Sequence, residues 1–448
     1  MPRILPLLLC LATLPALRPA AAQPIDDSLA ARVDALFTRW DKPDTPGAAV
    51  AVVRDGGIVY QRGYGSANLE YDLPITPSTV FLVASVSKQF TAFAIAMLAE
   101  QGKLSLDDEV RQYVPELHDF GPTITLRHLV HHTSGLRDEF GLLAMAGYHM
   151  DDVITKETIL DLAYRQRALN FEPGEEYLYC NTGYTLMAEI VERVTGQSFR
   201  AWTAENIFEP LGMRHSHFRD DYTSIIKNRA QGYYKDDDDG YKKQVINYAS
   251  VGASGLYTTA EDLARWALNF DDGRVGGQAV LDQVHQQGRL NKGDTLSYAF
   301  GQSIGHYKGR RRVSHSGSHR GFRTYLVRFP DDDLAIIVLS NLDAFNPSEM
   351  ALKVADLYLI DPPERLAEYT GTYHSEELDA TYRLTVEKGR LVARHRRYEA
   401  IALTPSDTDA FSGDSWFLST LAFTRAEGRI TGFRASNSRT RKVWFEKR

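Results

Sequence analysis

The stretch 81–102 places a serine and a lysine at the start of a long apolar segment, as Ser85-Val86-Ser87-Lys88. The segment is longer than a typical strand and ends at Gly102, which predicts a buried helix. If that helix begins near Ser85, Ser85 and Lys88 lie on one face and can contact each other. Free N–H groups at the helix start can stabilise an oxyanion. A hydroxyl nucleophile with a buried amine as its base could carry out acyl transfer.

Ser-x-x-Lys alone does not establish this chemistry, because so short a pattern also arises by chance. Ser224-Ile225-Ile226-Lys227 repeats the spacing with no chemical partner nearby in the sequence. An ordinary N-cap serine of a helix, followed by a surface lysine, would give the same sequence pattern as Ser85 and Lys88. The choice between these interpretations depends on partners elsewhere in the chain.

A second set of polar groups follows Pro173-Gly174, as Tyr179-Cys180-Asn181 on a loop before an apolar helix at 185–194. A nearby lysine ammonium can lower the pKa of a tyrosine, which could then act as the general base for a serine. Asn181 could hold that lysine or a substrate amide. The alternative is a tyrosine-rich core loop with an asparagine turn.

A third set lies on the strand-like run 313–318, which contains His315, Gly317 and Ser318. Glycine lets a substrate backbone approach an edge strand. The N–H of Ser318 could then complete an oxyanion hole with the N–H of Ser85. A lone histidine is more often structural, so His315 gains weight only from the other two sets.

The elements that must position these residues form an α+β pattern. An amphipathic helix at 26–39 precedes a hairpin of strands at 47–53 and 58–60, joined through Asp55-Gly56. The middle, to about residue 250, is mostly helical, and a capping box at Thr259 starts a helix through Phe270. Strands at 322–329 and 334–339 and a helix at 346–359 follow. We expect one antiparallel sheet built from both ends of the domain, flanked by helices, with a helical insertion and a cleft between them.

Beyond Asp361-Pro362-Pro363 the chain changes to short strand-like runs separated by turns, which is typical of a small β-barrel or sandwich. We therefore divide the chain into residues 1–22, a catalytic domain at 23–360 and a β-barrel domain at 361–448. The acidic run Asp236–Asp239 lacks the spacing of a calcium loop, and is predicted to be a solvated hairpin tip.

The first 22 residues have the form of a cleaved Sec-type signal peptide. Arg3 precedes an apolar run, and Ala20-Ala21-Ala22 is an A-x-A cleavage site before Gln23. Leu9, not a small residue, precedes Cys10, which argues against a lipoprotein. No later apolar run is long enough to span a membrane. We expect a periplasmic or secreted protein without stable membrane insertion.

Composition excludes further classes. The chain has 448 residues, 43% of them hydrophobic and 24% charged, as in ordinary globular proteins. Its formal charge of −7 argues against nonspecific nucleic-acid binding. After cleavage before Gln23, Cys180 is the one remaining cysteine, so an internal disulfide is not possible.

Together, Ser85-x-x-Lys88, Tyr179-x-Asn181 and His315-x-Gly317 resemble the three motifs of the serine β-lactamase and penicillin-binding-protein superfamily, in its class C-like form. The resemblance covers roughly residues 30–360. It extends to four further segments, Ile75-Thr76-Pro77, His132-Thr133-Ser134-Gly135-Leu136, Asn181-Thr182-Gly183-Tyr184 and Gly321-Phe322. The tail resembles the lipocalin-like domain appended to some peptidases of this group.

The resemblance implies that Ser85 is the acylated nucleophile and that Lys88 and Tyr179 move its proton. It further implies that Asn181 orients the lysine or the substrate amide, while His315 assists proton transfer or meets a substrate carboxylate. The N–H groups of Ser85 and Ser318 would form the oxyanion hole. The implied activity is that of a DD-carboxypeptidase or D-aminopeptidase, with a carboxylesterase or class C-like β-lactamase as alternatives.

Two departures from the class C pattern matter. Class C β-lactamases have lysine at the position of His315, and a histidine that is mostly neutral at pH 7 is a weaker anchor for a carboxylate. This favours a peptidase or an esterase over a β-lactamase. Cys180 stands between Tyr179 and Asn181, where the family usually has a small residue. It is either a nucleophile that competes with Ser85 or, as we expect, a packed thiol.

Two other classes of protein remain to be weighed. A zinc hydrolase could use His131, His132, His215, His217 and His315, but no H-E-x-x-H or comparable spacing is present, so no metal or cofactor is expected. A noncatalytic binding protein is a more distant alternative. The expected partners are a small-molecule or peptide substrate, with homo-oligomer assembly through the C-terminal domain as an option.

Overall fold

The computed structural model describes residues 27–236, 240–359, 363–407 and 409–448. The predicted signal peptide at 1–22, most of the acidic run Asp236–Asp239 and the boundary residues Asp361-Pro362 lie outside the described residues. Within the described part, no helix is both long enough and apolar enough to cross a membrane.

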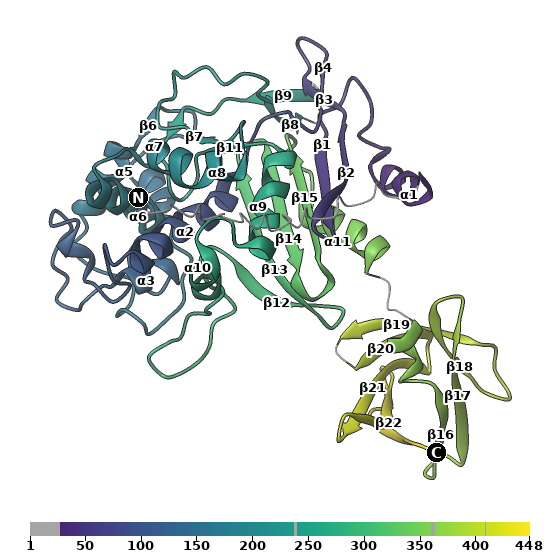
Figure 1. Cartoon of the computed structure of the whole chain (residues 1–448). Helices are drawn as coiled ribbons and strands as arrows, with labels where there is room; N and C mark the ends of the chain where they lie inside the picture. Colours follow the sequence, from purple (N-terminus) through teal and green to yellow (C-terminus); the bar gives the residue numbers. More distant parts are fainter. Residues whose placement is uncertain (1–26, 237–239, 360–362, 408) are drawn as a thin grey trace, which may run out of the picture.

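The catalytic domain is organised around an antiparallel sheet of six strands in the order β12-β13-β14-β15-β1-β2 (Figure 1). Its central pair joins the two ends of the domain, because β1 pairs with β15 from Ala48 opposite Ser340 to Arg54 opposite Leu334. The sheet predicted from both ends of the domain is therefore confirmed. Its strands are β1 (Ala48–Arg54), β2 (Gly57–Tyr64), β12 (Ser303–Tyr307), β13 (Arg310–His319), β14 (Phe322–Phe329) and β15 (Leu334–Ser340).

Strand β1 is buried on both faces, which explains its uninterrupted apolar sequence. Ala49 and Ala51 belong to one hydrophobic core, whereas Val50 and Val52 belong to another. Since successive side chains of a strand point to opposite faces, the sheet separates two helical layers. On the Val50 side lie α1 (Asp27–Phe37) and α11 (Pro347–Tyr358), and on the other lie α2 (Ser87–Glu100), α9 (Ala260–Asp272) and α10 (Gly277–Val284).

The chain between α2 and α9 forms the predicted helical insertion, which packs against α2 through α6. Its helices are α3 (Leu126–Val130), α4 (Glu139–Met145), α5 (Lys156–Tyr164), α6 (Asn181–Thr195), α7 (Phe199–Thr203), a π-helical turn (Ala204–Phe208) and α8 (Glu209–Leu211). The short strands β3 (Ser66–Asn68), β4 (Leu73–Pro74) and β5 (Phe81–Leu82) precede α2. Strand β6 (Ile154–Thr155) lies between α4 and α5, and after α8 come β7 (His217–Phe218), β8 (Gly232–Asp236), β9 (Gly240–Gln244), β10 (Tyr248–Ala249) and β11 (Leu256–Thr258).

Two local predictions need correction. The helix predicted to begin near Ser85 begins at Ser87, because Ala84–Val86 form a tighter 3₁₀ turn first. Strand β12 was not predicted, since its sequence Ser-Ile-Gly-His-Tyr is short and contains a glycine. The capping box at Thr259 is present in part, because the Thr259 side chain accepts a hydrogen bond from the N–H of Asp262.

The tail folds into a closed β-barrel, as predicted. After α12 (Pro363–Ala367) come its strands, β16 (Gly371–Ser375), β17 (Ala380–Glu387), β18 (Arg390–Arg394), β19 (Ile401–Asp407), β20 (Ala410–Ser415), β21 (Leu418–Ala426), β22 (Arg429–Ser436) and β23 (Val443–Lys447). Closure is made by β16 against β23, where Tyr373 faces Lys447. Tyr373, Leu421 and Phe433 are fully buried in its core.

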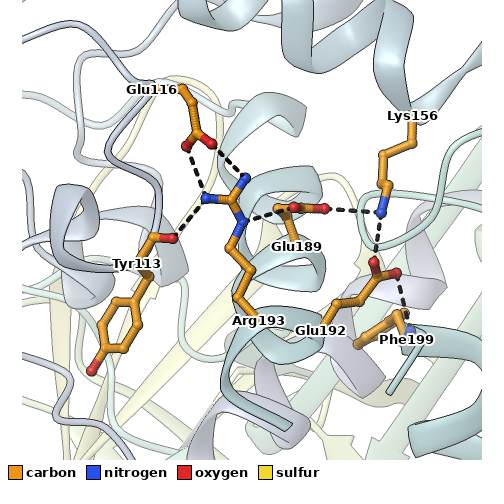
Figure 2. Close-up of polar contacts among 7 residues, drawn as sticks. All are labelled: Tyr113, Glu116, Lys156, Glu189, Glu192, Arg193 and Phe199. Atoms are coloured by element: carbon orange, nitrogen blue, oxygen red, sulfur yellow. Dashed lines mark hydrogen bonds and ion pairs between the residues drawn. The ribbon is translucent and has the colours of Figure 1, made fainter. Parts of the chain in front are cut away.

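A charged network fixes the insertion around α6 (Figure 2). Glu189 accepts from Arg193 at 2.8 Å and lies 2.9 Å from the Lys156 ammonium on α5. Arg193 extends the network to Glu116 at 2.8 Å, and Lys156 contacts Glu192 at 2.6 Å. Glu189 therefore joins two cations from different elements while its side chain is only 12% exposed.

Replacing Glu189 with alanine should lower the free energy of unfolding by about 1–2 kcal/mol, because a shared and poorly solvated carboxylate is lost. The Tm should fall by about 2–4 °C in scanning calorimetry. Asp161→Ala on α5 is the matched control. Asp161 pairs with Arg165 one turn away at an exposed surface, so its loss should cost no more than about 0.5 kcal/mol. Equal effects of the two changes would contradict a stabilising role for the network.

Candidate active site

Ser85 lies in the 3₁₀ turn that leads into α2, directly after a residue in an unusual conformation. Ala84 has a φ of +48°, a left-handed conformation that costs a non-glycine residue of order 1–3 kcal/mol. One turn later, the Lys88 ammonium lies 3.2 Å from the Ser85 hydroxyl. The predicted contact between the two residues is therefore present. Ser224 and Lys227, which share the spacing, lie in a surface loop away from this arrangement.

Lys88 is fully buried, and its ammonium is held by oxygen acceptors. Besides Ser85, it donates to the side-chain oxygen of Asn181 at 2.7 Å and to the carbonyl of Ala253 at 2.7 Å. It also lies over the ring of Tyr179, 4.9 Å from the centroid. Burial lowers the pKa of Lys88 to about 7, although the carboxylate of Glu139 opposes the shift. Near neutral pH a substantial fraction of Lys88 is therefore an uncharged amine that can accept a proton.

Asn181 was predicted on a loop before a helix at 185–194, but it is the first residue of α6, which begins four residues earlier than predicted. Asp138 fixes the orientation of its amide. One carboxylate oxygen of Asp138 accepts from both the backbone N–H and the side-chain NH₂ of Asn181, each at 2.7 Å. The amide oxygen is thereby left to face Lys88. Asp138 also caps α4 by accepting from the N–H of Phe140 at 3.0 Å. Sequence reasoning missed Asp138, whose only signal was its place after the 132–136 segment.

Glu139 is a buried carboxyl on the far side of the same cluster. It accepts from the hydroxyls of Thr185 and Tyr248, both at 2.7 Å. Burial raises its pKa to about 7, with the lysine charge acting in the opposite direction. Glu139 and Lys88 therefore titrate in the same range and influence each other.

Tyr179 corrects one sequence expectation. Its pKa is raised, not lowered, because burial is the largest cause and outweighs a hydrogen bond to Ser85. Tyr179 therefore keeps its proton at neutral pH, and cannot act as a resting tyrosinate base. Its hydroxyl can still relay a proton between Ser85 and a departing group, provided that another group accepts the first proton.

His315 lies on β13 and bonds to a residue that the sequence did not suggest. Its Nδ1 is 2.6 Å from the carbonyl of Ser316, and its Nε2 is 3.0 Å from the hydroxyl of Tyr298. Because a carbonyl only accepts, Nδ1 carries the proton and Nε2 accepts from Tyr298. Burial, assisted by the charge of Lys88, lowers the pKa of His315 to about 4. The imidazole is neutral and carries no charge for a substrate carboxylate.

Gly317 is required for packing as well as for access. A Cβ atom at this position would lie 2.2 Å from the carbonyl oxygen of Val83 and 2.3 Å from the hydroxyl of Thr324. Thr324 itself donates to the Val83 carbonyl at 2.9 Å. The glycine thus lets β13 approach the turn that carries Ser85. Strand β12 pairs with β13 only as far as Ser314, which leaves the segment with Ser318 at an open edge among the described residues.

Ser85, Tyr179, His315 and Ser318 line one open cavity of about 300 Å³, together with residues that include Tyr298. Lys88, Asn181 and Gly317 lie behind its wall, in the contacts given above. All seven residues singled out in the sequence are therefore gathered at one place. The roles assigned to them remain proposals.

Cys180 and His132 support the site from behind. Cys180 is 3% exposed, and burial raises the pKa of its thiol to about 12, as expected of a packed thiol. Its N–H donates to Nδ1 of His132 at 3.1 Å. The His132 ring packs against the rings of Tyr179 and Tyr298, with centroids 4.2 and 4.7 Å away. Across the residues that the structure covers, no group of three His, Cys, Asp or Glu side chains is placed to hold a metal ion.

A family model described as Beta-lactamase matches residues 32–359. The chain belongs to the Beta-lactamase family. This confirms the resemblance seen in the motifs, and identifies a hydrolase that uses a serine.

Among curated proteins, the chain is 27% identical over 377 residues to a D-aminopeptidase of Gluconobacter oxydans, covering 83% of this chain and 71% of the relative. It is 29% identical over 320 residues to a D-aminopeptidase of Brucella canis, covering 71% of this chain and 61% of that protein. The chain thus spans less than two thirds of the Brucella relative.

Solved structures agree on the fold. An octameric penicillin-binding protein homologue from Pyrococcus abyssi has a TM-score of 0.65 at 25% identity, covering 93% of this chain and 98% of its own. A D-amino acid amidase from Ochrobactrum anthropi has a TM-score of 0.64 at 21% identity, covering 74% of this chain and 99% of its own. The first similarity includes the β-barrel domain, and the second covers less of the chain.

If Lys88 accepts the proton of Ser85, the rate must follow the uncharged amine. kcat/KM should rise tenfold per pH unit below about pH 7 and level off above it, because Lys88 is protonated at low pH. Glu139→Gln removes a charge that raises the pKa of Lys88, so the rising limb should move to lower pH.

Lys88→Arg should lower kcat/KM by roughly 10³-fold or more, since arginine stays protonated. Lys227→Arg is the matched control and should leave the rate unchanged. A wild-type profile that is flat from about pH 6 to 8 would contradict the role of Lys88 as base.

Proposed function

We propose that the protein hydrolyses amides through an acyl-enzyme on Ser85, and that it removes an amino-terminal D-residue from short peptides. The observation that carries the catalytic part is the fully buried Lys88 ammonium, 3.2 Å from the Ser85 hydroxyl and with a pKa near 7. The D-aminopeptidase relatives at 27% and 29% identity support the substrate class.

In the proposed reaction the Ser85 oxygen attacks the substrate carbonyl while uncharged Lys88 takes its proton. The N–H groups of Ser85 and Ser318 stabilise the oxyanion. The proton then passes through the Tyr179 hydroxyl to the departing amine as the carbon–nitrogen bond breaks, leaving an ester on Ser85. Water attacks this ester, Lys88 accepts the water proton, and the proton returns to Ser85 as the acid product leaves.

The neutral His315 discriminates between the candidate activities. A DD-carboxypeptidase or a β-lactamase substrate carries a carboxylate that a cation would hold, whereas His315 is uncharged and already accepts from Tyr298. The substrate of an aminopeptidase or an esterase does not need a cation to hold a carboxylate at the scissile acyl group. The site therefore favours the aminopeptidase, with a carboxylesterase as the second candidate.

The purified protein should hydrolyse D-alanine p-nitroanilide with a kcat/KM at least about tenfold above that for the L-isomer, and turn over penicillin G poorly. A fluorophosphonate should add one mass label to the wild type. Ser85→Ala should abolish both reactions, while the matched variant Ser224→Ala keeps them.

Other results of these assays would support one of the alternative functions. Hydrolysis of p-nitrophenyl esters without the anilide would support the esterase. Efficient penicillin turnover through Ser85 would restore the β-lactamase alternative. No label on Ser85 would point to a noncatalytic binding protein.

We propose further that the protein assembles through its β-barrel. The Pyrococcus homologue, similar over 93% of this chain, is octameric. The barrel also exposes aromatic side chains, with Trp416 83% and Tyr398 56% exposed, both within stacking distance of Phe417. Such a surface suits contact with a second copy.

Light scattering on the eluting full chain should show an oligomer, and Trp416→Ala with Tyr398→Ala should yield smaller species that keep full activity. As a matched control on the catalytic domain, Tyr71→Ala, whose side chain is 74% exposed, should leave the mass unchanged. A monomeric wild type would reject this proposal.

We also propose export with cleavage before Gln23, on the strength of the A-x-A pattern at Ala20-Ala21-Ala22. The intact mass of protein recovered outside the cytoplasm checks it. A mass that includes residues 1–22 would contradict it.

A further inference from the structure

A second cavity, of about 440 Å³, lies between the catalytic domain and the β-barrel. The catalytic domain contributes α1, α11 and the turn between β12 and β13, and the barrel contributes the turn between β17 and β18 together with part of β19. Strands β12 and β19 contact each other beside it. Figure 1 shows the barrel below the tip of the β12–β13 hairpin.

Five basic side chains line this cavity, and they come from both domains. The catalytic domain supplies Arg32, Lys308 and Arg310, and the barrel supplies Lys388 and Arg390. Leu359 and Leu403 form apolar parts of the wall. Arg32, Lys388 and Arg390 are exposed, so an anion can reach them from solvent. A cleft lined by charges of one sign raises the local concentration of the opposite charge.

Two of the five cations are neutralised. Lys308 pairs with Asp356 at 2.6 Å, and Arg310 pairs with Asp332. Among the residues that the structure describes, Arg32, Lys388 and Arg390 form no ion pair.

Glu387 lies opposite Arg390 in the hairpin, yet its carboxylate binds Arg394 at 2.7 and 2.8 Å. Five basic side chains and the two carboxylates of Asp356 and Asp332 give this cavity a net charge of +3. The whole chain, in contrast, has a formal charge of −7.

We propose that this interdomain cavity is a binding site for a small polyanion that carries phosphate or carboxylate groups. The planar guanidinium groups of Arg32 and Arg390 can each form paired hydrogen bonds to such a group, and Lys388 adds a third charge. Because Arg32 belongs to the catalytic domain and Arg390 to the barrel, the bound anion bridges the two domains.

The site is separate from the Ser85 cavity but shares one hairpin with it. The tip of β12–β13 supplies Lys308 and Arg310 to the polyanion site, whereas Ser303 and His315, further along the same strands, line the Ser85 cavity. The anion bridges the domains without touching the reacting groups. Its binding should therefore raise the stability of the full chain, since it binds only the folded protein.

The test uses the full chain, with pyrophosphate and citrate as probes at a fixed ionic strength set by sodium chloride. Isothermal titration calorimetry should show one site per chain for at least one probe, and scanning calorimetry should show a rise in Tm with its concentration. Preference for pyrophosphate identifies a phosphate-bearing ligand, and preference for citrate identifies a carboxylate-bearing one.

Two double variants of equal charge decide whether binding occurs in this cavity. Lys388→Gln with Arg390→Gln should weaken Kd at least about tenfold and remove the rise in Tm, while hydrolysis through Ser85 continues. Arg439→Gln with Arg441→Gln, at exposed barrel positions outside the cavity lining, should leave Kd unchanged. Equal Kd values in both variants, or no binding of either probe to the wild type, would overturn the proposal.

Discussion

The burial of one ammonium group governs the chemistry of this protein. Lys88 is fully enclosed, and its charge is tolerated because Asn181, Ala253 and Ser85 present oxygen atoms to it. An isolated buried charge would cost far more than these hydrogen bonds return, so the group responds by releasing its proton more easily. Burial therefore makes Lys88 a base near neutral pH, while the three oxygen contacts keep its charged form tolerable.

Burial also sets the protonation of other groups in the site. Tyr179 stays protonated and His315 stays neutral, because burial disfavours the charged form of each. For His315, the nearby lysine charge acts in the same direction. Asp138 holds Asn181 so that its oxygen, and not its NH₂ group, faces the lysine. Lys88, behind the wall of the cavity, is thus a titrating cation placed against the nucleophile, which suits acyl transfer to uncharged substrates better than anchoring of an anionic one.

The sequence predicted the parts of the site that depend on local patterns. Ser85 and Lys88 are three residues apart, and Tyr179 and Asn181 are two residues apart, so each pair is visible as a short motif. The motifs indicated a site only in combination, because each of them alone also arises by chance. Asp138 and Tyr298 were missed because their partners are 43 and 17 residues away, and no periodicity records such contacts. The pKa of Tyr179 was predicted in the wrong direction because burial depends on packing from several elements.

The pairing of β1 with β15 has a consequence for the time at which this domain can fold. Ala48 pairs with Ser340, and on its other side β1 pairs with the neighbouring hairpin strand β2. A hairpin alone is marginally stable, so the central sheet waits until almost the whole domain has been synthesised. Contacts this distant in sequence slow folding, since a long loop must close before they form. The central sheet is therefore expected to form late, a timing that is compatible with the export proposed above.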